Sequence, residues 1–297
     1  MIFFSVIIPT YNRAHLITET VDTVLQQSYP HFEIIIVDDG STDNTRQVME
    51  NKYGHEARVK YFYKQNEERG VARNFGLKQA SGDYAVFFDS DDWMKRHYLD
   101  SLKSIIEKQP GIFLLAASYD YNNTGKTETH PELDKLPEGW YTRDLFLKGN
   151  ILACNYCIRI KEGSYIPFPE EKELATMEDW LFLLSNLETH KIFINKEICL
   201  TMRQHDERSM GNNQKVVEAR NNATAWALQH LTFNKADKNK LVAWSHYFCG
   251  IHQYLDNNRS ESVKETIAAI RTGGWNNKFL LLLVKSVIGR SFIKNIK

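Results

Sequence analysis

The sequence predicts an α/β fold with a mostly parallel central sheet flanked by helices, followed by a helical C-terminal region. Up to about residue 117, short and almost continuously apolar segments alternate with segments of helical period. That alternation is typical of βα units around a buried parallel sheet. Beyond about Gln214 the strand pattern disappears and helix-like segments dominate. We therefore expect a sheet domain over residues 1–213, with halves at 1–117 and 118–213, and a helical region over 214–297.

The individual elements are predicted in chain order. Strands are expected over 4–8, 32–37, 59–63, 84–88 and 112–116. Asn12 is expected to cap the first helix, and the segment that starts at Ser41 to cap the second, because short polar side chains favour that position. Further helices are expected over 70–80 and 95–108. A loop or hairpin over 119–138 precedes strands over 151–160 and 192–202, which enclose a helix that starts near Met177.

The composition is that of a globular protein and excludes several classes. The 297 residues carry 37 basic and 37 acidic side chains, so no global charge indicates a nucleic-acid partner. The N-terminus lacks a basic leader and reads as a strand rather than a signal peptide, and no apolar run approaches the ~20 residues of a membrane-spanning helix. The four cysteines fit a reducing compartment. Cys154 and Cys157 have the spacing of some metal or redox sites but lie in an apolar run, so we expect them to be structural.

Polar residues follow the predicted strands at their carboxyl ends, where open α/β sheets bind ligands. They are Pro9-Thr-Tyr-Asn, Asp38-Asp-Gly-Ser, Gln65-Asn-Glu-Glu-Arg-Gly and Asp89-Ser-Asp-Asp. The last group indicates a divalent cation, because neighbouring carboxylates repel one another unless a positive charge lies among them. Oxygen ligands in an open site suit Mg²⁺ or Mn²⁺ bound to phosphate. A solvated acidic turn that caps the helix from Lys95 is the alternative.

Other sites for cations and nucleotides are excluded by their patterns. An EF-hand loop counted from Asp89 would need Gly where Met94 stands and Glu where Asp100 stands. The sequence contains neither a Gly-x-Gly-x-x-Gly segment after a strand nor a Gly-x4-Gly-Lys-[Ser/Thr] loop. Phosphate charge would therefore be met by a metal and by arginines.

Five segments in register resemble the inverting nucleotide-sugar glycosyltransferases of family 2, which have the GT-A fold. They are Ser5-Val-Ile-Ile-Pro-Thr-Tyr-Asn-Arg, Ile36-Val-Asp-Asp-Gly-Ser-Thr-Asp, Gly70-Val-Ala-Arg-Asn-Phe-Gly, Ser81-Gly-Asp-Tyr and Phe87-Phe-Asp-Ser-Asp-Asp. A weaker resemblance continues through Glu178-Asp-Trp and Arg203-Gln-His-Asp-Glu-Arg-Ser. Beyond about Met210 the resemblance implies nothing.

The resemblance implies a nucleotide pocket. Asp39 would accept the N3 proton of uracil or thymine, and the pocket would be lined by Pro9, Tyr11, Asn66 and Arg73. A carboxylate acceptor favours these bases, so UDP is the expected nucleotide and dTDP the next. Guanine N1–H offers a similar donor. A purely structural role as a helix cap is the alternative for Asp38.

The resemblance also implies a metal site and a diphosphate site. Asp89 would lie near the ribose and the metal, and Asp91 would bind Mn²⁺ or Mg²⁺. His205 matches a position that supplies a further metal ligand in some members, although a lone His is more often an ordinary surface or packed residue. The residues expected at the sugar or diphosphate are Asp92, Trp180, Arg203 and Ser209.

Asp179 is implied to be the general base, with Glu178 beside it in the first turn of a helix, where the helix dipole stabilises carboxylates. It would remove the proton of an acceptor hydroxyl as that oxygen attacks the anomeric carbon, which inverts the configuration in a single displacement. The alternative is that Glu178 and Asp179 only improve the helix start. Trp180 either stacks on a sugar face or packs in the core.

The sequence therefore predicts a metal-dependent glycosyltransferase that uses a nucleotide sugar and a glycan or lipid-linked glycan acceptor in the cytoplasm. A catalytically silent sugar-binding module and a sugar nucleotidyltransferase are the rival functions. Residues 275–297 contain Lys278, Lys285, Arg290, Lys294 and Lys297 and no acid. This pattern is typical either of a basic amphipathic segment on the inner face of a membrane or of a last helix packed on the helical region.

Overall fold

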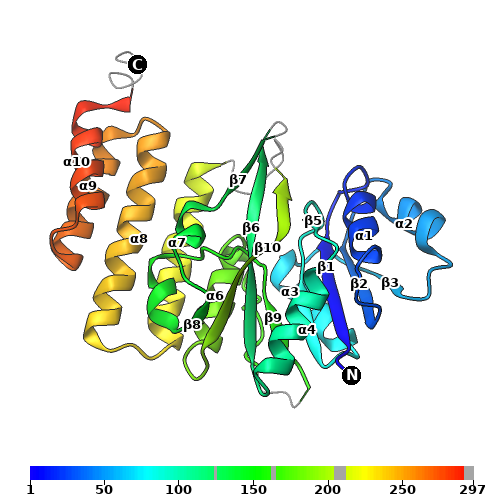
Figure 1. The fold of residues 1–297 in the computed structure, drawn as a ribbon. Helices are drawn as coiled ribbons and strands as arrows, with labels where there is room; N and C mark the ends of the chain where they lie inside the picture. The colour runs from blue at the N-terminus through cyan, green and yellow to red at the C-terminus, as the bar shows by residue number, and fades with distance from the viewer. Residues whose placement is uncertain (124–125, 162–164, 204–211, 291–297) are drawn as a thin grey trace. The chain divides into compact units, whose positions relative to one another are not determined.

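The computed structural model describes residues 1–123, 126–161, 165–203 and 212–290 (Figure 1). The chain divides into two compact units. The first contains residues 1–142, 151–172 and 189–205, and the second contains residues 143–150, 173–188 and 206–297. Among the described residues, ten strands form one sheet, and all of them belong to the first unit.

The N-terminal part of the first unit is built from alternating strands and helices. Its elements are β1 (Phe4–Thr10), α1 (Ile17–Leu25), β2 (Phe32–Asp39), α2 (Thr45–Tyr53), β3 (Val59–Lys64), α3 (Glu68–Gln79) and β4 (Tyr84–Phe87). The four strands are parallel in the order β3-β2-β1-β4. Every residue of β1, β2 and β4 is buried, which explains why these strands appear as apolar runs. The strand order reverses beside β1, so a topological switch point lies at its carboxyl end.

The rest of the sheet is mixed. It is formed by β5 (Trp93–Met94), β6 (Leu114–Asn123), β7 (Lys126–Thr129), β8 (Gly139–Tyr141), β9 (Cys157–Arg159) and β10 (Ile192–Arg203), with helices α4 (Tyr98–Lys108) and α5 (Pro131–Asp134). Strands β6 and β10 are parallel, whereas β9 is antiparallel to both β4 and β6. The expected hairpin after β6 is confirmed, because β7 pairs antiparallel with it. Parallel pairing is thus confined to β3-β2-β1-β4 and to β6-β10.

Two local predictions are wrong. Of the strand expected over 151–160 only β9 forms, and Asn155, just before it, is buried and bonds through its side chain to Ala117 O (2.9 Å) and Tyr98 Oη (2.7 Å). Asn12 does not cap α1, which begins at Ile17 without a side-chain cap. Its Oδ1 instead accepts hydrogen bonds from Thr42 N (2.8 Å) and Asp43 N (3.3 Å), which ties the loop after β1 to the loop after β2.

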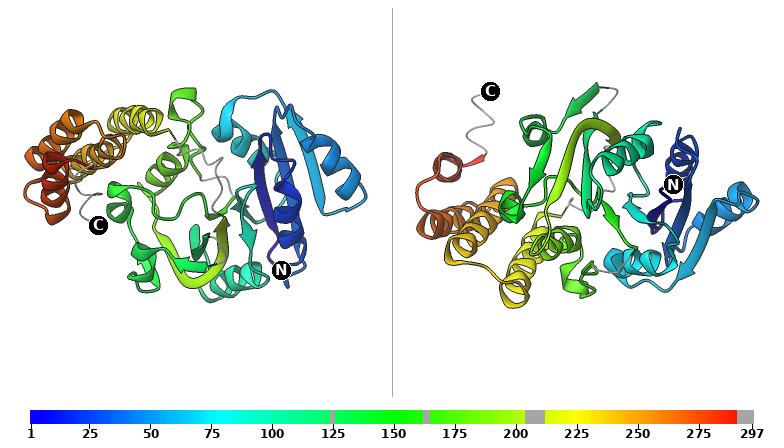
Figure 2. Two further views of the ribbon diagram at one scale, coloured as in Figure 1. Left: turned by 90° about the horizontal axis from the view of Figure 1, so that it is seen from above. Right: turned by 60° about the horizontal axis from the view of Figure 1, so that its bottom comes forward.

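The second unit is helical. It contains η1 (Arg143–Lys148), α6 (Glu178–Asn186), α7 (Asn213–His230), α8 (Lys235–Leu255), α9 (Arg259–Gly273) and α10 (Asn277–Ile288), while η2 (Lys172–Leu174) spans its boundary. Helices α8, α9 and α10 lie side by side (Figure 2) around Ala243, Ala269 and Phe279. The helical prediction beyond Gln214 is confirmed over the described residues. Among all the described residues, no helix is both long enough and apolar enough to cross a membrane.

Candidate active site

The loops after β1, β2 and β3 meet at the carboxyl edge of the parallel strands. Gly40 follows β2 with φ +85°, and a Cβ at this position would lie 2.8 Å from Asn66 N. Only glycine accepts both the left-handed backbone and this close approach. The edge therefore brings together the loops that carry Tyr11, Asp39 and Asn66.

Asp38 and Asp39 end β2 but have different environments. Asp38 is fully buried and accepts hydrogen bonds from Ser41 N (2.8 Å) and from Tyr61 Oη. Burial and this carboxylate raise the pKa of Tyr61. Asp38 therefore holds the turn after β2 together, and it does not cap a helix, because α2 begins only at Thr45. The Oδ1 atom of Asp39 accepts from Lys64 Nζ (2.7 Å) and from Glu67 N (3.1 Å).

The other predicted nucleotide contacts are arranged around this edge. Pro9 is buried within β1, whereas Tyr11 is 47% exposed and Asn66 is exposed. Lys64 was not singled out from the sequence, because a lysine at a strand end carries no pattern of its own. Its ammonium also lies 2.8 Å from Glu67 Oε2, so Lys64 joins the carboxyl end of β3 to the loop that leads to α3.

Arg73 connects α3 to the acidic loop after β4. Its side chain is buried, its Nη2 lies 2.9 Å from Asp89 Oδ1, and its guanidinium lies 5.4 Å from the ring centroid of Phe168. Asn74, the next residue, exchanges hydrogen bonds with Phe168: Asn74 Nδ2 donates to the carbonyl (2.9 Å), and Phe168 N donates to Asn74 Oδ1 (3.0 Å). The pairing holds residues 168–170 against α3, because Asn74 Nδ2 also reaches Glu170 Oε1 (2.8 Å).

The carboxylates of Asp89, Asp91 and Asp92 converge. Each offers an oxygen, and these oxygens all lie within 4.8 Å of one another. Arg203, at the end of β10, donates its backbone N to Asp92 Oδ1 (3.0 Å) and its Nε to the carbonyl of Asp91. Its guanidinium also lies 2.7 Å from Glu19 Oε2 and 5.0 Å from the ring centroid of Trp93. The structure thus brings Arg73, Arg203 and the three carboxylates together at the loop after β4.

Asp179 lies in the first turn of α6, in the second unit. Its Oδ2 accepts from Asn150 Nδ2 (2.7 Å), and its Oδ1 accepts from the backbone N of Trp180 (2.7 Å). Glu178 is 3% exposed. The sequence does not indicate a role for Asn150, because its partner lies 29 residues further along the chain.

Trp180 packs inside the second unit. It is 1% exposed, its Nε1 donates to Phe146 O (2.8 Å), and the guanidinium of Arg220 lies 3.6 Å from its ring centroid. Arg220 is equally buried and donates to Ser245 Oγ (3.1 Å) and Lys148 O (3.2 Å). Of the two interpretations of Trp180, this environment favours core packing. Burial lowers the pKa of Arg220.

Four further predicted residues lie outside the part of the chain that the structure describes, and two are buried cysteines. His205 and Ser209 lie outside the described residues, as do Lys294 and Lys297 of the tail. Cys154 and Cys157 are buried and form no disulfide, and burial raises the pKa of the Cys157 thiol, which disfavours the thiolate that metal binding or redox chemistry needs.

The chain is similar to bacterial glycosyltransferases. Residues 5–160 match the family described as Glycosyl transferase family 2. The chain is 36% identical over 188 residues to the putative teichuronic acid biosynthesis glycosyltransferase TuaG of Bacillus subtilis, covering 61% of this chain and 71% of that protein. It is 33% identical over 193 residues to the poly(ribitol-phosphate) beta-N-acetylglucosaminyltransferase TarS of Staphylococcus aureus, covering 62% of this chain but only 32% of TarS.

Solved structures share the fold. TarS 1-349 from S. aureus in complex with UDP-GlcNAc superposes with a TM-score of 0.68 at 22% identity, covering 99% of this chain and 89% of that one. The mannosyltransferase PcManGT from Pyrobaculum calidifontis in complex with GDP-Man and Mn²⁺ superposes with a TM-score of 0.61 at 17% identity. The superposition covers 98% of this chain and 82% of that one. The fold is therefore the GT-A α/β fold, and the chain belongs to glycosyl transferase family 2 and is a glycosyltransferase.

Proposed function

We propose that the protein is a metal-dependent inverting glycosyltransferase that moves a sugar from a UDP-sugar to a hydroxyl of a glycan or lipid-linked glycan. The observation that carries the donor side is the convergence of Asp89, Asp91 and Asp92 at the carboxyl end of the parallel strands, with the buried Arg73 on Asp89. In this proposal residues 1–117 bind the nucleotide sugar, residues 118–213 serve the acceptor and the base, and residues 214–297 form the helical region.

The carboxylate group fits a divalent cation. Its donors are hard oxygens in a half-exposed loop, and both Asp89 and Asp91 are partly accessible. Such donors suit Mn²⁺ or Mg²⁺ held by carboxylates and phosphate oxygens together. Asp91, with Asp89, would hold the cation, and a bound cation supplies charge neutralisation on the leaving diphosphate. His205 stays a proposed additional ligand.

The protein's own residues perform the remaining tasks of donor binding. Asp39 accepts a ring N–H of the base, which favours uracil or thymine, while Pro9, Tyr11 and Asn66 border the base. The buried Arg73 fixes Asp89 beside the ribose. Arg203, with Ser209, provides hydrogen-bond donors for the diphosphate, and Asp92 holds the Arg203 backbone in place through its N–H (3.0 Å).

Asp179 is the proposed general base. Asn150 donates to its Oδ2, which fixes the carboxylate plane, and Asp179 lies in the first turn of α6, where the helix dipole stabilises a carboxylate. It takes the proton of the acceptor hydroxyl while that oxygen forms the bond to the anomeric carbon and the bond to the diphosphate breaks. Glu178 lies beside it and is buried.

A cytoplasmic location and a cell-envelope polymer as acceptor complete the proposal. The names of two bacterial relatives support the acceptor class: TuaG is described as acting in teichuronic acid biosynthesis, and TarS as acting on poly(ribitol-phosphate). A silent binding module and a nucleotidyltransferase are the alternatives.

The product formed from the donor tests the proposal. Wild type is incubated with UDP-, dTDP- and GDP-sugars and Mn²⁺, and the released nucleotide is identified by anion-exchange chromatography. We expect slow release of UDP from a UDP-sugar, reduced at least about 100-fold in Asp91→Asn and unchanged in the matched control Asp134→Asn, an exposed acid in α5. Release of pyrophosphate from a sugar phosphate and a nucleoside triphosphate would instead identify a nucleotidyltransferase. Donor binding without turnover, even with added glycan acceptors, would indicate a binding module.

A further inference from the structure

Helix α10 presents an apolar face to solvent. Trp275, just before it, is 82% exposed, and four apolar side chains of the helix are 44–55% exposed. Single exposed apolar residues are ordinary, but the four on the helix recur at helical spacing along one side of it. We define the α10 stripe as these four residues together with Trp275 before the helix; its members are Trp275, Leu281, Val284, Val287 and Ile288.

The orientation of α10 is fixed from its opposite side. Phe279, Leu282 and Ser286 are buried, and Ser286 Oγ lies 2.6 Å from Ser262 Oγ of α9, which in turn donates to Gly250 O of α8 (2.8 Å). Rotating α10 to bury the stripe would break these buried hydrogen bonds, which carries a penalty for each group left unsatisfied. The stripe is therefore a stable surface of the second unit.

The charged side chains of α10 itself are all basic. Lys278 and Lys285 are exposed and lie seven residues apart, hence on the same flank of the helix. The sequence from residue 266 to 297 contains six basic residues and no acid. A second copy of the chain docked through the same stripe would bring like charges together, which disfavours self-association. The surface thus matches a partner that is both apolar and anionic.

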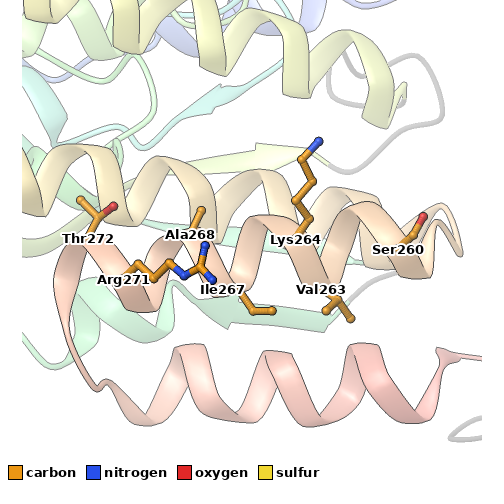
Figure 3. A pocket seen from close by; sticks show the side chains of 7 residues that line it. All are labelled: Ser260, Val263, Lys264, Ile267, Ala268, Arg271 and Thr272. Atoms are coloured by element: carbon orange, nitrogen blue, oxygen red, sulfur yellow. The ribbon is translucent and has the colours of Figure 1, made fainter.

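A neighbouring surface is a weaker candidate. A depression of about 520 Å³ runs along α9, and all the side chains that line it come from this one helix (Figure 3). Its cations are Lys264 and Arg271, and Lys264 lies 3.2 Å from Glu261, which offsets its charge. A depression walled by a single helix does not enclose a small molecule.

We propose that the α10 stripe, together with Lys278 and Lys285, binds the surface of an anionic lipid bilayer. A helix of this kind lies in the plane of the interface, with its apolar side chains below the headgroups and its lysines against lipid phosphates. α10 has 12 residues and is far too short to span a bilayer. The proposal uses no residue of the nucleotide site, so it stands or falls separately from the proposed transferase activity.

Vesicle flotation of the full chain tests the proposal. Wild type is mixed with vesicles of phosphatidylcholine alone, or with vesicles that also contain roughly 30% of the anionic lipid phosphatidylglycerol. We expect the protein to float only with the anionic vesicles. Its binding should weaken as the salt concentration rises from about 0.05 to about 0.5 M, because salt screens surface charges. Binding of UDP, measured in parallel, should not depend on the vesicles.

Two variants with a matched control separate the components of the surface. Lys278→Glu/Lys285→Glu should lower the association constant at least tenfold, since each lysine near an anionic surface contributes about fivefold. Leu281→Gln/Val284→Gln should lower it similarly without a change of charge. The control Lys215→Glu/Lys238→Glu makes the same charge change at exposed positions of α7 and α8 and should bind within about twofold of wild type. Circular dichroism and thermal unfolding confirm that each variant is folded.

Three results would overturn the proposal. One is the absence of wild-type flotation with anionic vesicles while the protein is folded. Another is equal flotation of the two α10 variants and the control. The third is a protein that does not bind vesicles but forms a concentration-dependent oligomer, seen by light scattering and abolished by Leu281→Gln/Val284→Gln. That result would make the α10 stripe a protein–protein interface.

Discussion

Asp179 has the surroundings that a general base needs. One oxygen accepts from the Asn150 side chain at 2.7 Å and the other from its own helix start, so the carboxylate is fixed in one orientation. Orientation matters because proton transfer requires the base within hydrogen-bond reach of the acceptor hydroxyl. Asn150 is therefore a positioning residue in this account, and Asp179 the group that moves the proton.

Substitution of Asp179 should separate chemistry from binding. We expect Asp179→Asn to lower kcat by about 10²–10⁴-fold while the affinity for UDP stays unchanged. Asn150→Ala should lower kcat less, by roughly tenfold, because the carboxylate remains but is no longer held. Glu218→Gln, an exposed acid of α7, serves as the control. Steady-state kinetics with calorimetry would measure both quantities, and wild-type kcat in Asp179→Asn would rule out its assigned role.

At the residue scale, the sequence shows the charged groups of the site but not the groups that hold them. Asp89, Asp91 and Asp92 are adjacent in the chain, so their convergence is predictable. Asn74 is recognisable only as a neighbour of Arg73, because its partner Phe168 lies 94 residues away. A side chain whose partner is that remote leaves no local pattern.

At the scale of elements, Glu33 ties the first strands together. Its Oε1 accepts from Ser5 Oγ (2.6 Å), Ser81 N (2.7 Å) and Ser81 Oγ (2.8 Å), and its Oε2 lies 2.5 Å from Lys60 Nζ. Burial by itself raises the pKa of Glu33, but the hydrogen bonds from Lys60, Ser5 and Ser81 outweigh it and lower the pKa below its ordinary value. One carboxylate thus joins β1, β2, β3 and the approach to β4.

The lowered pKa gives a signed pH dependence. The stability that Glu33 contributes is present above its unfolded pKa of about 4.5 and is lost as the pH falls through the lower folded pKa. Glu33→Gln should therefore reduce the free energy of unfolding by about 1–3 kcal/mol at pH 7, with the difference shrinking towards pH 3. The control Glu107→Gln removes a surface pair with Lys103 and should change the free energy of unfolding by at most about 1 kcal/mol. Urea unfolding at several pH values tests this, and a difference that does not depend on pH would contradict it.

Arg220 links three elements of the second unit through a buried cation. It stacks on Trp180 of α6 and donates to Lys148 O of η1 and Ser245 Oγ of α8. Arg220→Met should destabilise the protein by about 2–3 kcal/mol, because two acceptors lose a charged donor and the cation–π contact disappears. Arg220→Lys should recover only part of the loss, since ammonium cannot stack as a plane. Arg259→Met, at an exposed position of α9, is the control. Urea midpoints equal to wild type in Arg220→Met would contradict this description.

At this scale the buried elements were predictable and the short ones were not. The strands β1, β2 and β4 are covered on both faces and therefore appear as apolar runs. In contrast, β5 has two residues and β9 has three, and their pairing with β10, β4 and β6 is set by contacts distant in sequence. The same holds for the second unit, whose residues 143–150 and 173–188 join the C-terminal helices by contact rather than by chain order.

At the scale of the molecule, the proposed function depends on the acidic loop after β4, which we propose to be a metal-dependent nucleotide site. The most direct measurement is calorimetric titration of UDP, dTDP, GDP and CMP with and without Mn²⁺, on wild type, Asp91→Asn and the control Asp134→Asn. We expect Mn²⁺-dependent binding of UDP, or of dTDP, that weakens at least about tenfold in Asp91→Asn and is unchanged in Asp134→Asn. Nucleotide binding that depends neither on Mn²⁺ nor on Asp91 would contradict the proposed metal-dependent site. So would the absence of binding of any of these nucleotides to folded wild type.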